Sequence, residues 1–170
     1  MAFTAKDVQA LRERTNCGMM DCKKALTEAD GDMEKAVEIL REKGLAAATK
    51  KAGRIAAEGV VLATVDADTK VGVVIEVNSE TDFVAKNEKF MDFVQSCAKT
   101  IAAHKPANVD ELLKMPAVGM ERTVEEELRD KILTIGENMK IRRFTYAEGA
   151  CVTYVHGGGR IGVMVTFDTD

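Results

Sequence analysis

The chain has few of the side chains from which metal sites and active sites are usually built. Among its 170 residues there are only two histidines and four cysteines, and tryptophan is absent. Four residues separate Cys17 from Cys22, which is not the usual spacing of a zinc or redox motif. We therefore expect four reduced thiols and neither a metal site nor a cofactor.

Long apolar runs and a strong excess of one charge are missing as well. No stretch of 18 apolar residues occurs, and the first residues, Met-Ala-Phe-Thr-Ala-Lys, lack the apolar segment of a secretory signal. The formal net charge of −4 does not favour a nucleic-acid or membrane surface as partner. These absences predict a cytoplasmic protein that binds neither nucleic acid nor membranes. The length allows one or two domains with a sizeable core.

Residues 4–44 have the pattern of three short helices. Thr4 is placed to cap the first helix and Asp32 to cap the third. The third helix has apolar residues at helical spacing and is expected to end at Gly44. The pattern predicts a three-helix domain over 1–44. A basic, small-residue linker over 45–56, part helix and part tether, follows it.

A β-hairpin pattern occurs twice, ninety residues apart and without a gap. Ala57-Glu58-Gly59 recurs as Ala147-Glu148-Gly149, and Lys70-Val71-Gly72-Val73 recurs as Arg160-Ile161-Gly162-Val163. A constant offset with the same glycine and charge positions indicates two copies of one unit. It predicts that residues 60–66 pair with 71–77, and that residues 150–156 pair with 161–167.

Helices are expected between the two hairpins. Asn87 is placed to cap a helix whose apolar residues share one face and which Pro106 ends. Thr123 and Glu126 form a capping box for a second helix, and Gly136 is its expected stop. The resulting fold class is α+β, with core subdomains over 57–140 and 141–170. Because no helix follows the second hairpin, we expect a fragment in which one face or edge of that hairpin is less covered.

No conventional catalytic motif is found. There is no nucleophile elbow, H-E-x-x-H segment or P-loop. The run Gly157-Gly158-Gly159 falls in a predicted hairpin turn, where glycine serves the backbone conformation. Covalent catalysis is therefore not expected.

Four carboxylates cluster in sequence and leave one enzymatic alternative open. They could hold Mg²⁺ in a small metal-dependent hydrolase. Two of them, however, fall near a helix start, where acidic groups offset unpaired N–H groups, and Ser79-x-x-Asp82 is a plausible cap. The four are Glu76, Glu80, Asp82 and Glu88.

At three positions the side chains are candidates for contact with a partner, but the residues alone do not decide between such a contact and a purely structural position. Phe83 follows Asp82 at the end of a strand. There, a phenylalanine is more often core, although an exposed one would be a rigid interface anchor. Met19 and Met20 follow a glycine turn, so that one can bury while the other stays exposed. His156, at the tip of the second hairpin, is either solvated or a polar partner contact.

Four segments stand out as specific blocks: LRERTNCGMMDCKKAL (11–26), EVNSETDFVAK (76–86), GENMKIRR (136–143) and HGGGRIGV (156–163). They resemble blocks of the bacterial elongation factor Ts family, and the resemblance runs through the whole chain. It implies a ubiquitin-associated-like fold for the N-terminal helices and a core of two related subdomains. Family members bind elongation factor Tu and expel GDP without a covalent step.

The resemblance also implies a partner-binding site. The motif formed by Thr81, Asp82 and Phe83 would reach the GTPase domain of the partner near its Mg²⁺ site, which favours the exposed interpretation of Phe83. The further implied contacts are Arg12, Met19 and Met20 to the same domain, Ile135 and Gly136 from the core, and His156 to the third domain.

Family members continue beyond the point at which this chain ends, and some form homodimers. A homodimer is therefore possible here, but the absence of those later segments would put it in doubt. The alternative of another class is a ubiquitin-associated-like adaptor that binds a different protein, and capture of elongation factor Tu would discriminate between the two.

Overall fold

The computed structural model describes residues 3–15 and 17–168, so the outermost ends of the first and last predicted domains lie outside the described residues. It has the expected α+β class, with helices first and strands after them. The chain divides into two compact units, which are described separately. One comprises the residues up to Gly53 together with Arg129–Glu137, and the other comprises Arg54–Leu128 and the residues from Asn138 onward.

The first unit contains the three predicted helices, α1 (Ala5–Thr15), α2 (Met19–Glu28) and α3 (Met33–Lys51). Asp32 caps α3, because its carboxylate accepts a hydrogen bond from the N–H of Lys35 at 3.0 Å. The predicted helix end at Gly44 is wrong. Gly44 is buried against the backbone of Arg129, and the alanine- and lysine-rich segment after it has high helix propensity.

The second unit is built around two antiparallel sheets. Strands β1 (Glu58–Val65), β2 (Gly72–Ser79) and β3 (Met139–Ala147) form one sheet in that order, and β4 (Cys151–His156) and β5 (Ile161–Thr166) form the other. Val60 pairs with Val77 and Cys151 with Thr166, so both predicted hairpin registers are confirmed. The predicted border between the core subdomains, at 140/141, falls inside β3, which pairs with β2.

Helices cover one face of the three-stranded sheet. The turn after β2 contains the short helix η1 (Val84–Lys86), and α4 (Glu88–His104) then packs on β1 and β2. The Asn87 cap and the Thr123–Glu126 capping box are confirmed, the latter at the start of α6 (Val124–Ile135). A further helix, α5 (Val109–Lys114), was not predicted.

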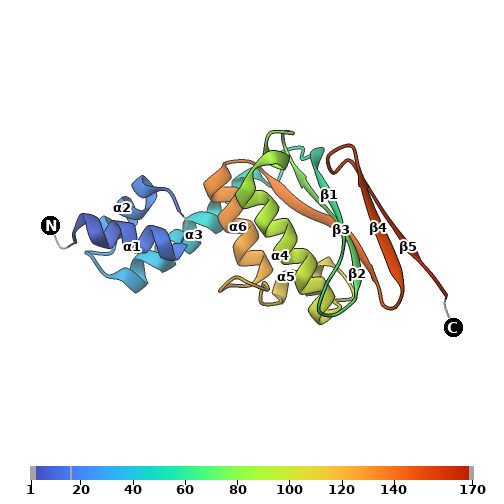
Figure 1. Cartoon of the computed structure of the whole chain (residues 1–170). Coiled ribbons are helices and arrows are strands. Elements are labelled where there is room, and N and C mark those ends of the chain that lie inside the picture. The colour runs from blue at the N-terminus through green and yellow to red at the C-terminus, as the bar shows by residue number, and fades with distance from the viewer. Residues whose placement is uncertain (1–2, 16, 169–170) are drawn as a thin grey trace. The chain divides into compact units, whose positions relative to one another are not determined.

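The second hairpin packs on the other face of this sheet (Figure 1). A Cβ atom on Gly162 would lie 2.5 Å from Cγ1 of Val61 and 3.4 Å from Cγ1 of Val74. A Cβ atom on Gly72 would lie 2.6 Å from the Sγ atom of Cys151 and 2.6 Å from the Sδ atom of Met164. The two glycines therefore let the sheets approach each other closely.

These contacts are reciprocal. Gly72, Val61 and Val74 correspond to Gly162, Cys151 and Met164 under the ninety-residue offset. Gly162 lies against Val61 and Val74. Gly72 lies against their equivalents in the second copy, Cys151 and Met164. The repeat seen in the sequence is consequently a local two-fold relation in space.

Within the described part of the chain, no helix has the length and apolar character that a membrane crossing requires.

Candidate partner-binding site

Phe83 lies in the turn between β2 and η1, with 78% of its surface exposed. The next residue, Val84, is buried and anchors the turn. The N–H of Lys86 donates to the carbonyl of Phe83 at 3.2 Å, and the N–H of Asn87 donates to the carbonyl of Val84 at 2.9 Å. The site thus presents an aromatic ring to solvent on a fixed backbone, and the core interpretation of Phe83 is wrong.

The chain just before this turn is fixed by a small polar network. The Glu80 carboxylate accepts a hydrogen bond from the N–H of Asn138 at 2.6 Å and one from the guanidinium of Arg54 at 3.4 Å. The side-chain amide of Asn138 in turn donates to the carbonyl of Arg54 at 2.8 Å. Residues far apart in sequence therefore hold the end of β2. The sequence patterns had indicated no such function for Arg54 or Asn138.

Asp82 is exposed beside Phe83, whereas Thr81 is half-buried. The predicted cap from Ser79 to Asp82 is wrong, because the Ser79 hydroxyl donates to the carbonyl of Thr81 at 2.9 Å. The helix η1 has Phe83 as its N-cap and no side-chain cap. An exposed carboxylate and an exposed ring therefore stand side by side on one turn.

The four carboxylates that suggested a metal site are not gathered around one point. Glu76 pairs with Arg143 at 2.7 Å and with Arg142 at 3.6 Å. Glu80 belongs to the network before the turn. In residues 3–15 and 17–168, no group of three or more histidine, cysteine or acidic side chains is placed to hold a metal ion. The acidic cluster is therefore a cluster in sequence only.

In the first unit, Met19 and Met20 are both exposed at the start of α2, at 59% and 62%. The expectation that one of them would bury is wrong, because Cys17 and Cys22 fill the adjacent core. Arg12, on α1, is also exposed. The three residues give this unit an apolar and basic surface.

The thiol of Cys17 is buried in the core of the first unit and is unreactive at neutral pH. Its sulfur donates to the carboxylate of Asp130 at 3.5 Å. Burial, reinforced by the negative charge of Asp130, raises the pKa of the Cys17 thiol to about 12. Burial also raises the pKa of Cys22 and Cys97. These cysteines are structural at neutral pH, because the thiolate is the nucleophilic form.

The remaining implied contacts lie at the ends of secondary-structure elements. Ile135 is half-buried at the end of α6, and Gly136 follows with a φ of +90°. His156 is exposed at the end of β4, and its Nδ1 atom is hydrogen-bonded to the Tyr154 hydroxyl at 2.9 Å. Tyr154 was missed, although its position two residues before His156 places both on one face of the strand.

The implied site residues divide between the two units. The second unit, called the core unit from here on, contains Thr81, Asp82, Phe83 and His156. The first unit contains Arg12, Met19, Met20, Ile135 and Gly136.

Comparison with known proteins agrees with the resemblance. Residues 80–170 match the family described as Elongation factor TS. The chain is 54% identical to elongation factor Ts of Trichlorobacter lovleyi over 174 residues, which cover 100% of this chain and 56% of the relative. It is 60% identical to that of Clostridium novyi over 166 residues, which cover 95% of this chain and 54% of the relative. The chain thus spans about half the length of the relatives it matches.

Proposed function

Since the chain belongs to the elongation factor Ts family, we propose that it is a guanine-nucleotide exchange factor of translation elongation. It binds elongation factor Tu in the GDP-bound form in the cytoplasm and promotes the release of GDP. The reaction makes and breaks no covalent bond, because the factor only changes the affinity of its partner for the nucleotide. By linkage, bound GDP weakens the binding of the factor by the same ratio.

The observation that carries this proposal is the exposure of Phe83 on a backbone that hydrogen bonds hold in place. A rigid exposed aromatic residue is the kind of anchor that dominates the energy of an interface. It also loses little conformational entropy on binding, because its turn is already ordered. The neighbouring Asp82 adds a negative charge at the same point of contact.

GDP binding by the partner explains how such a wedge would act. Mg²⁺ requires near-ideal octahedral geometry, and phosphates are held by backbone N–H groups at fixed positions. A wedge that moves the backbone of that site by a small distance weakens both interactions at once. Phe83 and Asp82 would supply the wedge in the GTPase domain.

The other exposed residues would hold the factor on its partner. Arg12, Met19 and Met20 would dock on the same GTPase domain, with Ile135 and Gly136 contributing further contacts. His156 would contact the third domain of the partner, with the Tyr154 hydroxyl fixing the imidazole ring.

Release of fluorescently labelled GDP from elongation factor Tu, with and without the 170-residue chain, tests the proposal. We expect the chain to accelerate release and Phe83→Ala to lose most of that acceleration. Ile55→Ala serves as the control, because Ile55 is also strongly exposed in the core unit but lies outside the site. If the chain captures elongation factor Tu but leaves the rate of GDP release unchanged, the proposal is wrong.

A further inference from the structure

Strand β2 ends beside the exposed turn, at a point where its backbone pairing stops on both sides at once. Ser79 pairs with Glu58 of β1 and with Met139 of β3, and in the described part of the chain neither register continues past Ser79. The exposed ring of Phe83 follows in the next turn of the chain. The direction of this ring therefore depends on contacts other than the backbone ladder of the sheet.

The side chain of Glu80 connects the three strands at that point. Its Oε1 atom accepts a hydrogen bond at 2.6 Å from the backbone N–H of Asn138, the residue before β3. The same oxygen accepts a bond at 3.4 Å from the guanidinium of Arg54, in the segment before β1. The side-chain amide of Asn138 donates to the carbonyl of Arg54 at 2.8 Å and completes the cycle. One carboxylate oxygen thus joins the segments that precede both neighbours of β2.

The bond between Glu80 and Asn138 carries most of this restraint. It is short and has an ionised acceptor, and hydrogen bonds of that kind are the strong ones. The guanidinium of Arg54 lies farther away and its side chain is 49% exposed, so that its ion pair contributes little. Glu80 and Asn138 are therefore the effective pair, and the Arg54 side chain adds a weaker contact.

The turn that carries the ring is restrained at both of its ends. Within the turn, the Ser79 hydroxyl donates to the carbonyl of Thr81, and the N–H of Lys86 donates to the carbonyl of Phe83. These local bonds keep the shape of the turn. Its orientation relative to the sheet is fixed by the buried Val84 where the turn ends and by Glu80 where it begins.

We propose that Glu80 is a positioning residue of nucleotide exchange, which acts through Phe83 and is itself held by Asn138. This inference rests on the exchange function proposed above. The network keeps the ring in its binding orientation before the partner arrives, so that little conformational freedom is lost in the complex. Without the network, part of the free energy of the contact goes into ordering the turn, and the wedge displaces the metal site of the partner less effectively.

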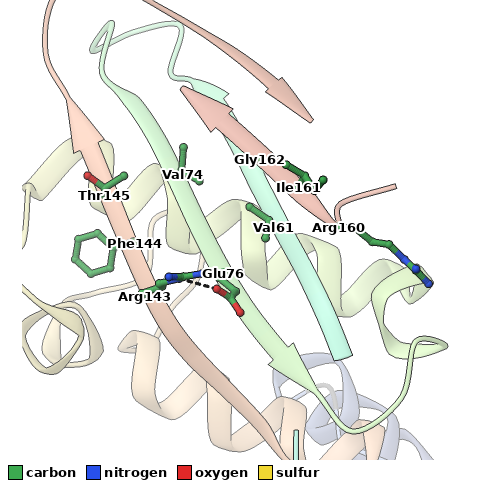
Figure 2. Close-up of a pocket in the computed structure, with 9 residues that line it drawn as sticks. All are labelled: Val61, Val74, Glu76, Arg143, Phe144, Thr145, Arg160, Ile161 and Gly162. Atoms are coloured by element: carbon green, nitrogen blue, oxygen red, sulfur yellow. Dashed lines mark hydrogen bonds and ion pairs between the residues drawn. The ribbon is translucent and has the colours of Figure 1, made fainter. Parts of the chain in front are cut away.

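Glu76 offers a matched comparison on the same strand. Its carboxylate also pairs with an arginine, Arg143, at 2.7 Å (Figure 2). The side chains of Glu76 and Glu80 are similarly exposed, at 19% and 22%. Glu76, however, lies within the paired part of β2, opposite Val61 in one register and Arg143 in the other. Its truncation should affect the sheet without loosening the turn.

The first test observes the turn in the complete chain without any partner. Backbone NMR relaxation of residues 81–84 should give order parameters of about 0.85 in the wild type and below about 0.6 in Glu80→Ala. Glu80→Gln, which keeps an acceptor oxygen in place, should restore the wild-type values, and Glu76→Ala should not change them. Where Glu80→Ala does not fold, Glu80→Asp replaces it, because the shorter side chain withdraws the acceptor and keeps the charge. A turn that stays rigid in these Glu80 variants overturns the proposal.

The second test measures the release of labelled GDP from elongation factor Tu. Glu80→Ala should slow the stimulated release about three- to tenfold, while Glu80→Gln and Glu76→Ala should stay near the wild-type rate. In a Phe83→Ala background, Glu80→Ala should have no further effect, because its action passes through the ring. A residue with a merely structural role would slow release by the same factor in both backgrounds, and that result also overturns the proposal.

The two tests separate this proposal from the proposed function. If the wild-type chain does not stimulate GDP release, the exchange function is wrong and Glu80 positions no exchange residue, even where the NMR data show that it orders the turn. If the wild type stimulates release and the turn of Glu80→Ala stays rigid, the exchange function stands and the positioning role of Glu80 is wrong.

Discussion

The carboxylate of Glu80 accepts a hydrogen bond from the backbone N–H of Asn138 at 2.6 Å, and this bond ties the end of β2 to the residue that precedes β3. Asn138 is buried, with 8% of its surface exposed. The bond stands immediately before the turn that carries Phe83. It therefore links the stability of the sheet to the position of the exposed ring.

Glu80→Ala should lower the free energy of unfolding by about 1–3 kcal/mol, because it leaves a buried donor without its acceptor. The control is Glu58→Ala, which removes an exposed carboxylate from β1 in the same unit. Urea unfolding followed by circular dichroism measures both variants. Equal unfolding midpoints for the two would show that the Glu80–Asn138 bond contributes nothing to stability.

Phe83→Ala should leave the melting temperature nearly unchanged, because truncation of an exposed ring creates no cavity. Phe90→Ala is the contrasting variant. Because Phe90 is fully buried, its truncation should lower the free energy of unfolding by about 3–5 kcal/mol. In the GDP-release assay, Phe83→Ala should slow the stimulated rate by about ten- to thirtyfold, as expected for loss of an interface anchor. A Phe83→Ala variant that unfolds far more easily but still stimulates release would refute the assignment of Phe83 as a wedge.

Gly162→Ala should destabilise the core unit by about 1–3 kcal/mol, because its methyl group would overlap the branched side chain of Val61. Gly72→Ala should cost less, since its methyl group would meet the sulfur atoms of Cys151 and Met164, which can rotate aside more easily than a branched side chain. The double variant Gly162→Ala/Val61→Ala should recover part of the loss. Chemical denaturation of the four proteins, wild type included, checks the order. An unaffected Gly162→Ala protein would contradict the close approach of the sheets.

Stability should fall as the pH rises above about 9, the ordinary value for a thiol, towards the raised pKa of about 12 of Cys17. In the folded chain the protonated thiol is favoured, so its contribution is complete below this window and is lost within it. Unfolding free energies between pH 7 and 11 measure the decline. Cys17→Ala should flatten the curve in part, because it removes this thiol. Identical curves for wild type and Cys17→Ala would contradict the prediction.

The sequence predicts most of the fold because its main signals are local or periodic. Capping residues such as Asn87 and Asp32 are visible within one turn of a helix, and the repeat makes the two hairpin registers mutually consistent. The extension of α3 past Gly44 was missed, because a glycine inside a helix resembles a stop when its tertiary contacts are unknown.

The candidate site is predicted less completely, for a physical reason. Whether Phe83 is exposed depends on the direction of a turn, which the buried Val84 and the Glu80–Asn138 bond fix from outside the motif. Residues alone favour burial for a phenylalanine, and only the family resemblance favours exposure. The hydrogen bond between Tyr154 and His156 could be predicted only once the strand and its exposed face were known.

The pairing of β2 with β3 sets the order in which this chain can fold during its synthesis. Ser79 pairs with Met139 and Gly72 with Ala147, so one edge of β2 has no partner until a long later stretch has left the ribosome. Contacts between residues so far apart in sequence form slowly, because loop closure precedes the gain from pairing. The first hairpin and its helix α4 can assemble earlier from local contacts. Until β3 arrives, the open edge of β2 is the part of the nascent chain most exposed to mispairing with another strand.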